Sequence, residues 1–249
     1  MTAITVERIK LFSTRSPYWC LLLILVACLG MATLIGLIES GREATTATSQ
    51  AGTNLGMMIF MVLAALAVTT EYRFGTIRTT FLAEPNRTVV LLAKTVLLAV
   101  LGAVVGAVGA LAAFYLTKLL ASDPRVPLSL ESGEDWRIVV GHAALFAIAA
   151  VIAVAIGTLV RQSAGAIAIV LVWALVLENL LGAIPALTDA SRWFPFNAGG
   201  RFVQPTTGDV LQSLVSPSGP TPVQGLLVFA GTAVVLWVAA LVILRRRDA

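Results

Sequence analysis

Residues 69–94 read TTEYRFGTIRTTFLAEPNRTVVLLAK, a charged segment between two long apolar runs. At 100° per residue, Phe74, Ile77 and Phe81 fall within about 60° of one another, which predicts a short amphipathic helix. Three threonines fall on its other side: Thr76, Thr79 and Thr80. Pro85 ends this helix because proline cannot continue the backbone hydrogen bonds. We expect either a docking surface for a soluble partner or an interfacial loop with ordinary positive charge.

The chain as a whole is more apolar than a soluble domain. Of its 249 residues, 58% are hydrophobic and 12% are charged, whereas soluble domains average about 25% charged residues. About 20 apolar residues are needed to cross the roughly 30 Å hydrocarbon layer. Six windows meet this requirement: 18–38, 52–70, 88–117, 138–160, 164–185 and 224–244. The sequence therefore predicts an all-α membrane protein with six spans, a single transmembrane domain over residues 1–249.

The distribution of Lys and Arg predicts the orientation of these spans. With both termini in the cytoplasm, eleven of the 17 basic residues lie inside and six outside, as the positive-inside rule requires. The predicted order is a cytoplasmic helix at 1–17, spans one to three at 18–117 with the charged segment at 71–87, an outer loop at 118–137, spans four and five at 138–185, an outer loop at 186–223, span six at 224–244 and a cytoplasmic tail at 245–249. The positive charge indicates contact with anionic membrane lipids and not with nucleic acid.

Two segments outside the spans carry their own apolar pattern. In 1–17, Val6, Ile9 and Phe12 share an arc of about 120°, which is typical of an amphipathic helix on the inner leaflet. A basic flank without such a helix is the alternative. The stretch 186–223 holds four aromatic residues in ten positions: Trp193, Phe194, Phe196 and Phe202. Their density favours an outer re-entrant or interfacial element before span six over an ordinary packed loop.

Small and polar residues mark positions inside the predicted spans. Gly102 and Gly106 form a G-x-x-x-G pair, and Gly109 follows on the same side. Such glycines allow close helix packing, either within this chain or between two protomers. Glu178 is an acid well inside a span, where a carboxylate is costly. It either binds cationic or polar cargo, takes part in gating, or serves as a structural hydrogen-bond anchor.

The sequence lacks the motifs of several chemistries. One histidine, His142, is too few for a histidine-based zinc site. Cys20 and Cys28 both lie in the first span, where thiols pack as small apolar side chains. The phosphate-binding motif G-x-x-x-x-G-K-[ST] is absent from the sequence. We therefore expect no catalytic residue, metal site or cofactor in this chain, and expect uphill transport to draw its energy from another chain.

The segment 69–94 resembles the stretch that follows the second span in ABC type-2 exporter permeases. The matching positions are Glu71, Gly75, Thr76, Arg78, Leu82, Pro85, Arg87 and Lys94. The N-terminal ERIKLFSTRSPYW, residues 7–19, is similar to the first segment of the same family. The resemblance covers the whole six-span plan. It implies an N-terminal connecting helix, a cytoplasmic coupling helix after span two and an outer re-entrant element before span six.

The resemblance also implies partners and a function. Permeases of this family pair with a second permease subunit, identical or related, and with two copies of a separate ATP-binding subunit that carries ATP and Mg. They sit in the bacterial plasma membrane and mostly export amphipathic, lipid-like or drug-like compounds. The residues that would contact the ATPase are Glu71, Arg73, Phe74, Gly75, Thr76, Ile77, Arg78 and Phe81. The competing functions are a non-transporting membrane assembly or sensing partner and a stand-alone secondary carrier.

Overall fold

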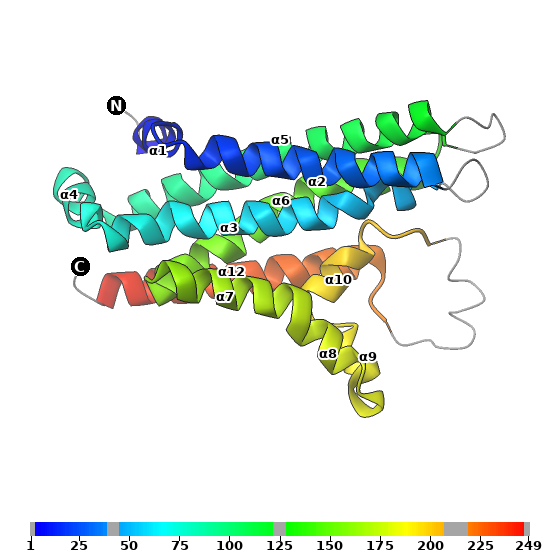
Figure 1. Cartoon of the computed structure of the whole chain (residues 1–249). Helices are drawn as coiled ribbons and strands as arrows, with labels where there is room; N and C mark the ends of the chain where they lie inside the picture. The colour runs from blue at the N-terminus through cyan, green and yellow to red at the C-terminus, as the bar shows by residue number, and fades with distance from the viewer. Residues whose placement is uncertain (1–2, 39–44, 122–127, 207–218, 247–249) are drawn as a thin grey trace.

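The structure is a computed structural model that describes residues 3–38, 45–121, 128–206 and 219–246 (Figure 1). Within these ranges the regular secondary structure is helical. The helices are α1 (Ala3–Phe12), α2 (Ser16–Ile38), α3 (Ala51–Arg73), α4 (Thr76–Ala83), α5 (Arg87–Leu120), α6 (Gly133–Val160), α7 (Ser163–Val172), α8 (Glu178–Gly182), α9 (Thr188–Ser191), α10 (Pro195–Arg201) and α12 (Pro222–Arg246). A π-helix, Trp173–Leu177, joins α7 to α8, and 3-10 turns lie at Thr48–Gln50 and Pro185–Leu187.

Six helical stretches are long and apolar enough to cross a membrane. They are Ser16–Leu37, Thr48–Arg73, Arg87–Leu120, Gly133–Val160, Ser163–Gly182 and Pro222–Arg246. Each overlaps one of the windows predicted from the sequence. This confirms the prediction of an all-helical, multi-pass membrane protein.

Helical structure extends into both ends of the predicted outer loop at 118–137. α5 continues to Leu120, and α6 already begins at Gly133. The early start of α6 comes from a capping box, in which the Asp135 backbone N–H donates to Ser132 Oγ at 3.1 Å and the Ser132 N–H donates to Asp135 Oδ2 at 3.1 Å. These bonds satisfy two backbone donors that a helix start leaves unpaired. The helix therefore extends through polar residues that an apolar window excludes.

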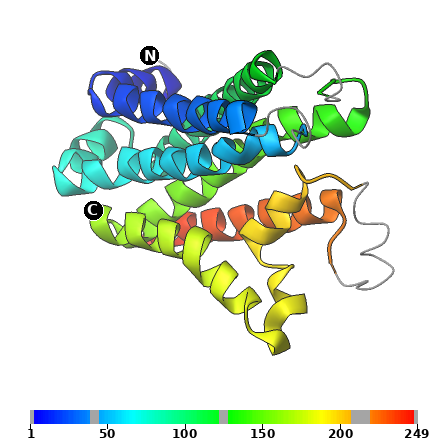
Figure 2. The same ribbon diagram turned by 45° about the vertical axis from the view of Figure 1, so that its right-hand side comes forward.

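α6 lies at the centre of the bundle and packs against α3, α5, α7 and α12 (Figure 2). Glycines on α5 make the closest of these contacts possible. A Cβ on Gly102 would lie 2.9 Å from the Phe146 carbonyl oxygen, and a Cβ on Gly106 would lie 2.7 Å from the His142 carbonyl oxygen. The predicted G-x-x-x-G pair thus faces α6 of the same chain. Gly109 faces α2, where its Cβ would lie 3.3 Å from Cys28 Sγ.

Both ends of the described chain lie at one end of the bundle, which we call the terminal end (Figure 1). α1 and α4 lie at this end. On α1, Glu7 and Leu11 are buried, whereas Val6 and Ile9 are exposed. At the opposite end α8 and α9 lean away from the bundle, and α10 packs on α12.

Gly106→Ala should destabilise the bundle, because the added methyl group would press on the backbone of α6. Overpacking of this kind costs about 1–3 kcal/mol. Gly231→Ala on α12 is the matched control, since a methyl group added there would meet nothing within 4 Å. The measurement is the thermal unfolding midpoint of both purified variants in one detergent. An unchanged midpoint for Gly106→Ala would contradict the close approach of α5 and α6.

Candidate functional site

The segment 69–94 contains the end of α3, the whole of α4 and the start of α5, so the short helix predicted to carry Phe74, Ile77 and Phe81 begins only after Phe74. α3 runs to Arg73, and α4 begins at Thr76. Between them Gly75 adopts φ +70°, the left-handed conformation that glycine reaches without a Cβ clash. Glu71 and Arg73 therefore belong to the end of a span, and only the residues after Gly75 belong to the short helix.

The break at Gly75 also separates the three apolar residues that were predicted to share one face. Phe74 is 71% exposed, whereas Ile77 is buried at 8%. Phe81 is half-buried, and the Arg87 guanidinium lies 5.2 Å from its ring centroid. The apolar residues that project outward are Phe74 and Leu82, the latter 82% exposed. Arg78 is also exposed and, four residues before Leu82, lies on the same side of α4. We call Arg78 and Leu82, together with Phe74 just before the helix, the outer face of α4.

Behind α4 lies a group of charges that we call the ion cluster: the buried Glu7, Glu71 and Lys94 and the half-buried Lys10. Lys94 Nζ donates to Glu71 Oε1 at 3.0 Å, to the Ala67 carbonyl oxygen at 3.2 Å and to Glu7 Oε2. Lys10 Nζ donates to Glu7 Oε1 at 3.1 Å and to Glu71 Oε1 at 3.3 Å. The cluster thereby joins α1, α3 and α5, and its formal charges cancel.

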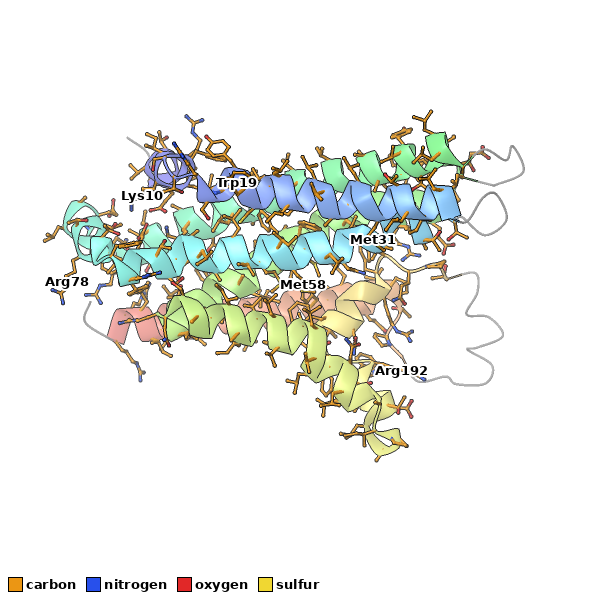
Figure 3. All side chains as sticks on the ribbon, in the orientation of Figure 1. Lys10, Trp19, Met31, Met58, Arg78 and Arg192 are labelled. Carbon is orange, nitrogen blue, oxygen red and sulfur yellow. The ribbon has the colours of Figure 1, made fainter. Side chains whose placement is uncertain are left out.

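Lys10 extends the ion cluster to α4. Its Nζ donates to Thr80 Oγ1 at 2.8 Å, and Thr80 Oγ1 in turn donates to the Thr76 carbonyl oxygen at 3.0 Å. Figure 3 shows Lys10 and Arg78 at the terminal end of the bundle. One network of ion pairs and hydrogen bonds therefore joins α1 to the three consecutive helices α3, α4 and α5.

Sequence reasoning misses most of this cluster. It places Glu71 in contact with a partner, and Lys94 enters only through the family resemblance. Lys94 lies seven residues into α5, within the predicted window 88–117. An ionisable residue at such a position requires a buried partner, and this signal is present in the sequence. The identity of the partner Glu7 is not, because the fold alone brings it to Lys94 from 87 positions away.

Glu178 is buried and holds the start of α10. Its Oε1 accepts from the Phe196 backbone N–H at 3.1 Å, and its Oε2 accepts from the Asn197 N–H at 2.7 Å. A helix start leaves such donors unpaired, and a carboxylate satisfies them well. Of the roles considered for Glu178, this geometry supports the structural anchor.

A π-helix and aromatic packing surround this anchor. The π-helix Trp173–Leu177 directly precedes Glu178, and the wider turn shifts the register of the residues that follow it. The Phe196 ring lies 5.7 Å from the Trp173 ring and 5.4 Å from the Phe229 ring, centroid to centroid. α10 thus binds Glu178 of α8 through its backbone and packs against the π-helix and α12 through the Phe196 ring.

The described residues hold no group of three or more His, Cys, Asp and Glu side chains placed to bind a metal ion. The ion cluster has two carboxylates, but two ammonium groups already bind them. His142 is buried, and its Nδ1 lies 2.8 Å from the Ile138 carbonyl oxygen. These polar side chains therefore bind other parts of the chain.

Comparison with protein-family models gives no match, and comparison with the curated proteins gives none either. The resemblance of residues 69–94 to ABC type-2 permeases thus stays a prediction. Any function must be argued from the geometry of this chain.

Lys94→Met should destabilise the protein strongly, because it leaves Glu7 and Glu71 buried without their shared partner. Removing one member of a buried ion pair costs about 3–5 kcal/mol. The triple variant Glu7→Gln, Glu71→Gln, Lys94→Met should recover part of that loss, since the two carboxylate charges are removed as well. Thermal unfolding of the single and triple variants measures this. A triple variant less stable than Lys94→Met would contradict the charge balance of the cluster.

Glu178→Gln should lower the unfolding midpoint, because the amide NH₂ replaces one of two acceptors that face backbone N–H groups. An unsatisfied buried donor costs about 1–3 kcal/mol. Asn179→Gln, an exposed position on the same helix, is the control. If the role is structural, any transport activity falls equally for all cargoes. A stable Glu178→Gln protein that loses only cationic cargo would instead indicate a binding role.

Proposed function

We propose that this chain is the permease subunit of an ATP-driven exporter, powered through α4 by a separate ATP-binding subunit. The observation that carries the proposal is the ion cluster. It links α4, through Thr80 and Lys10, to helix α1 and to two of the long apolar helices, α3 and α5. A short helix at the bundle end with such a link can transmit force from a partner to the spans.

The outer face of α4 supports a docking role. Phe74, Arg78 and Leu82 are exposed, whereas Ile77 faces the bundle. Apolar side chains flanking a charge are typical of a short helix that enters a groove on a partner. Under this proposal the terminal end is cytoplasmic, as the positive-inside rule predicts. α4 then corresponds to the coupling helix and α1 to the connecting helix of ABC type-2 permeases.

The transmission path follows from the contacts behind α4. Lys10 binds Thr80 on one side and the two carboxylates of the cluster on the other. Because Lys94 binds Glu71 directly, α3 and α5 are joined at the same level. A displacement of α4 therefore either pulls on Lys10 and the ion cluster or breaks the hydrogen bond between Lys10 and Thr80.

The buried charges disfavour a stand-alone carrier. Ion-coupled carriers use intramembrane ionisable groups that change partners during transport. Lys94 and Glu178 lie within the long apolar helices, and both bind other segments of this chain. We propose an amphipathic, lipid-like or drug-like cargo, two permease subunits and two ATPase subunits in the bacterial plasma membrane. ATP and Mg would bind to the ATPase.

Phe74→Ala combined with Arg78→Ala should leave the protein folded but weaken its association with the ATPase. Both side chains are exposed, so the bundle loses little packing. Truncating one interface hot spot costs about 2 kcal/mol or more, which is roughly a 30-fold loss of affinity. The measurement is co-purification with a co-expressed ATP-binding subunit, together with ATP hydrolysis and ATP-dependent flux in reconstituted vesicles.

The control is Leu119→Ala combined with Lys118→Ala, an exposed apolar and basic pair at the other end of α5. It should leave association and hydrolysis unchanged. If the wild-type chain, reconstituted with the ATP-binding subunit, shows no ATP-dependent flux, the exporter proposal fails. If flux is present but both variants behave like the wild type, the ATPase does not act through α4.

A further inference from the structure

A pocket of about 680 Å³ opens at the terminal end, beside the ion cluster. The start of α2 and the helices α1, α3, α4 and α5 line it. One side is apolar and includes Leu63, Leu66 and Leu97. The other side carries hydroxyl groups, among them those of Ser13, Thr76 and Thr79.

The two sides lie at different depths along the long helices. Leu97 is ten residues beyond the start of α5 at Arg87, which is about 15 Å at 1.5 Å per residue. The hydroxyl groups come from α4 and from the turn between α1 and α2, at the bundle end. The pocket thus runs from headgroup level into the depth of the acyl chains. A soluble ligand has no need of such an apolar extension, whereas a membrane lipid fits it.

The charges around the mouth select the kind of lipid. Arg8, Arg15 and Arg73 are exposed on the segments that form the mouth, each next in sequence to a residue that lines the pocket. The ion cluster inside contributes two acids and two bases, whose formal charges cancel. The mouth is therefore positive, and basic pockets between membrane helices bind anionic headgroups.

We infer that this pocket holds one anionic phospholipid from the leaflet at the terminal end. An acyl chain lies along Leu63, Leu66 and Leu97. The phosphate lies at headgroup level, where the mouth arginines provide donors. The volume is within the range of about 300–1,000 Å³ typical of small-molecule sites. Such a lipid contacts both α1 and α4, so it adds a second link beside the bond between Lys10 and Thr80. This inference does not depend on the ATPase.

The test titrates purified full-length protein with phosphatidylglycerol or phosphatidylcholine and counts bound lipids by native mass spectrometry. The expected result is one tightly bound phosphatidylglycerol per chain and no tightly bound phosphatidylcholine. Leu66→Trp should abolish this binding, because the indole fills the apolar side of the pocket. Val62→Trp is the matched control, a half-buried position on the same helix that does not line the pocket. Equal loss in both tryptophan variants would overturn the inference.

A second pair of variants removes charge and leaves the pocket volume unchanged. Arg8→Gln combined with Arg15→Gln should weaken phosphatidylglycerol binding at least tenfold, since each basic residue near the headgroups contributes to anionic-lipid affinity. Arg245→Gln combined with Arg246→Gln removes the same charge from the end of α12 and should have no such effect. Equal affinity for the two lipids in the wild type would overturn the inference, as would an equal loss in the two charge variants. The lipid titrations contain neither ATP nor the ATPase, so their outcome does not depend on whether the exporter proposal is correct.

Discussion

The buried ammonium group of Lys94 is the constraint on which the terminal end of this protein depends. An isolated charge at that depth is too costly to remain unpaired. It is held by Glu71 from the neighbouring long helix and by Glu7 from α1. These contacts fix where α1 lies, and Lys10, one turn further along α1, then reaches Thr80. The position of α4 thus follows from the need to satisfy one lysine.

The opposite end of the bundle uses the same physical rule with a different partner. There the buried charge is the carboxylate of Glu178, and backbone N–H groups at the start of α10 satisfy it. Between the two ends, packing is governed by the absence of side chains, since Gly102 and Gly106 let α5 approach α6. At each end, a buried charge that lipid could not solvate determines which segments pack together. In the middle, the small glycine residues allow α5 and α6 to pack closely.

The sequence predicted the six long helices because hydrophobic length is a local property that composition alone reveals. The sequence did not predict contacts between distant residues, because nothing in the residues around Glu7 indicates that it binds Lys94. The break at Gly75 was missed because a helical wheel assumes continuous helix, whereas a positive φ rotates the following residues to a new face. The charge of Glu178 was noticed, but its partners could not be identified, because backbone donors carry no sequence signature.

The break at Gly75 and the bond from Lys10 to Thr80 have opposite effects on α4, and together they determine how it can move. A glycine in the left-handed region gives the backbone freedom at the start of α4. The hydrogen bond from Lys10 restrains the middle of the helix at Thr80. A partner that pushes on the outer face of α4 therefore acts on a helix that is joined to α3 at Gly75 and hydrogen-bonded to the ion cluster at Thr80. Because that attachment leads to Glu71 on α3, the proposed force from the ATPase would reach α3 through side chains as well as through the backbone at Gly75, whose N–H donates to the Tyr72 carbonyl oxygen at 3.3 Å.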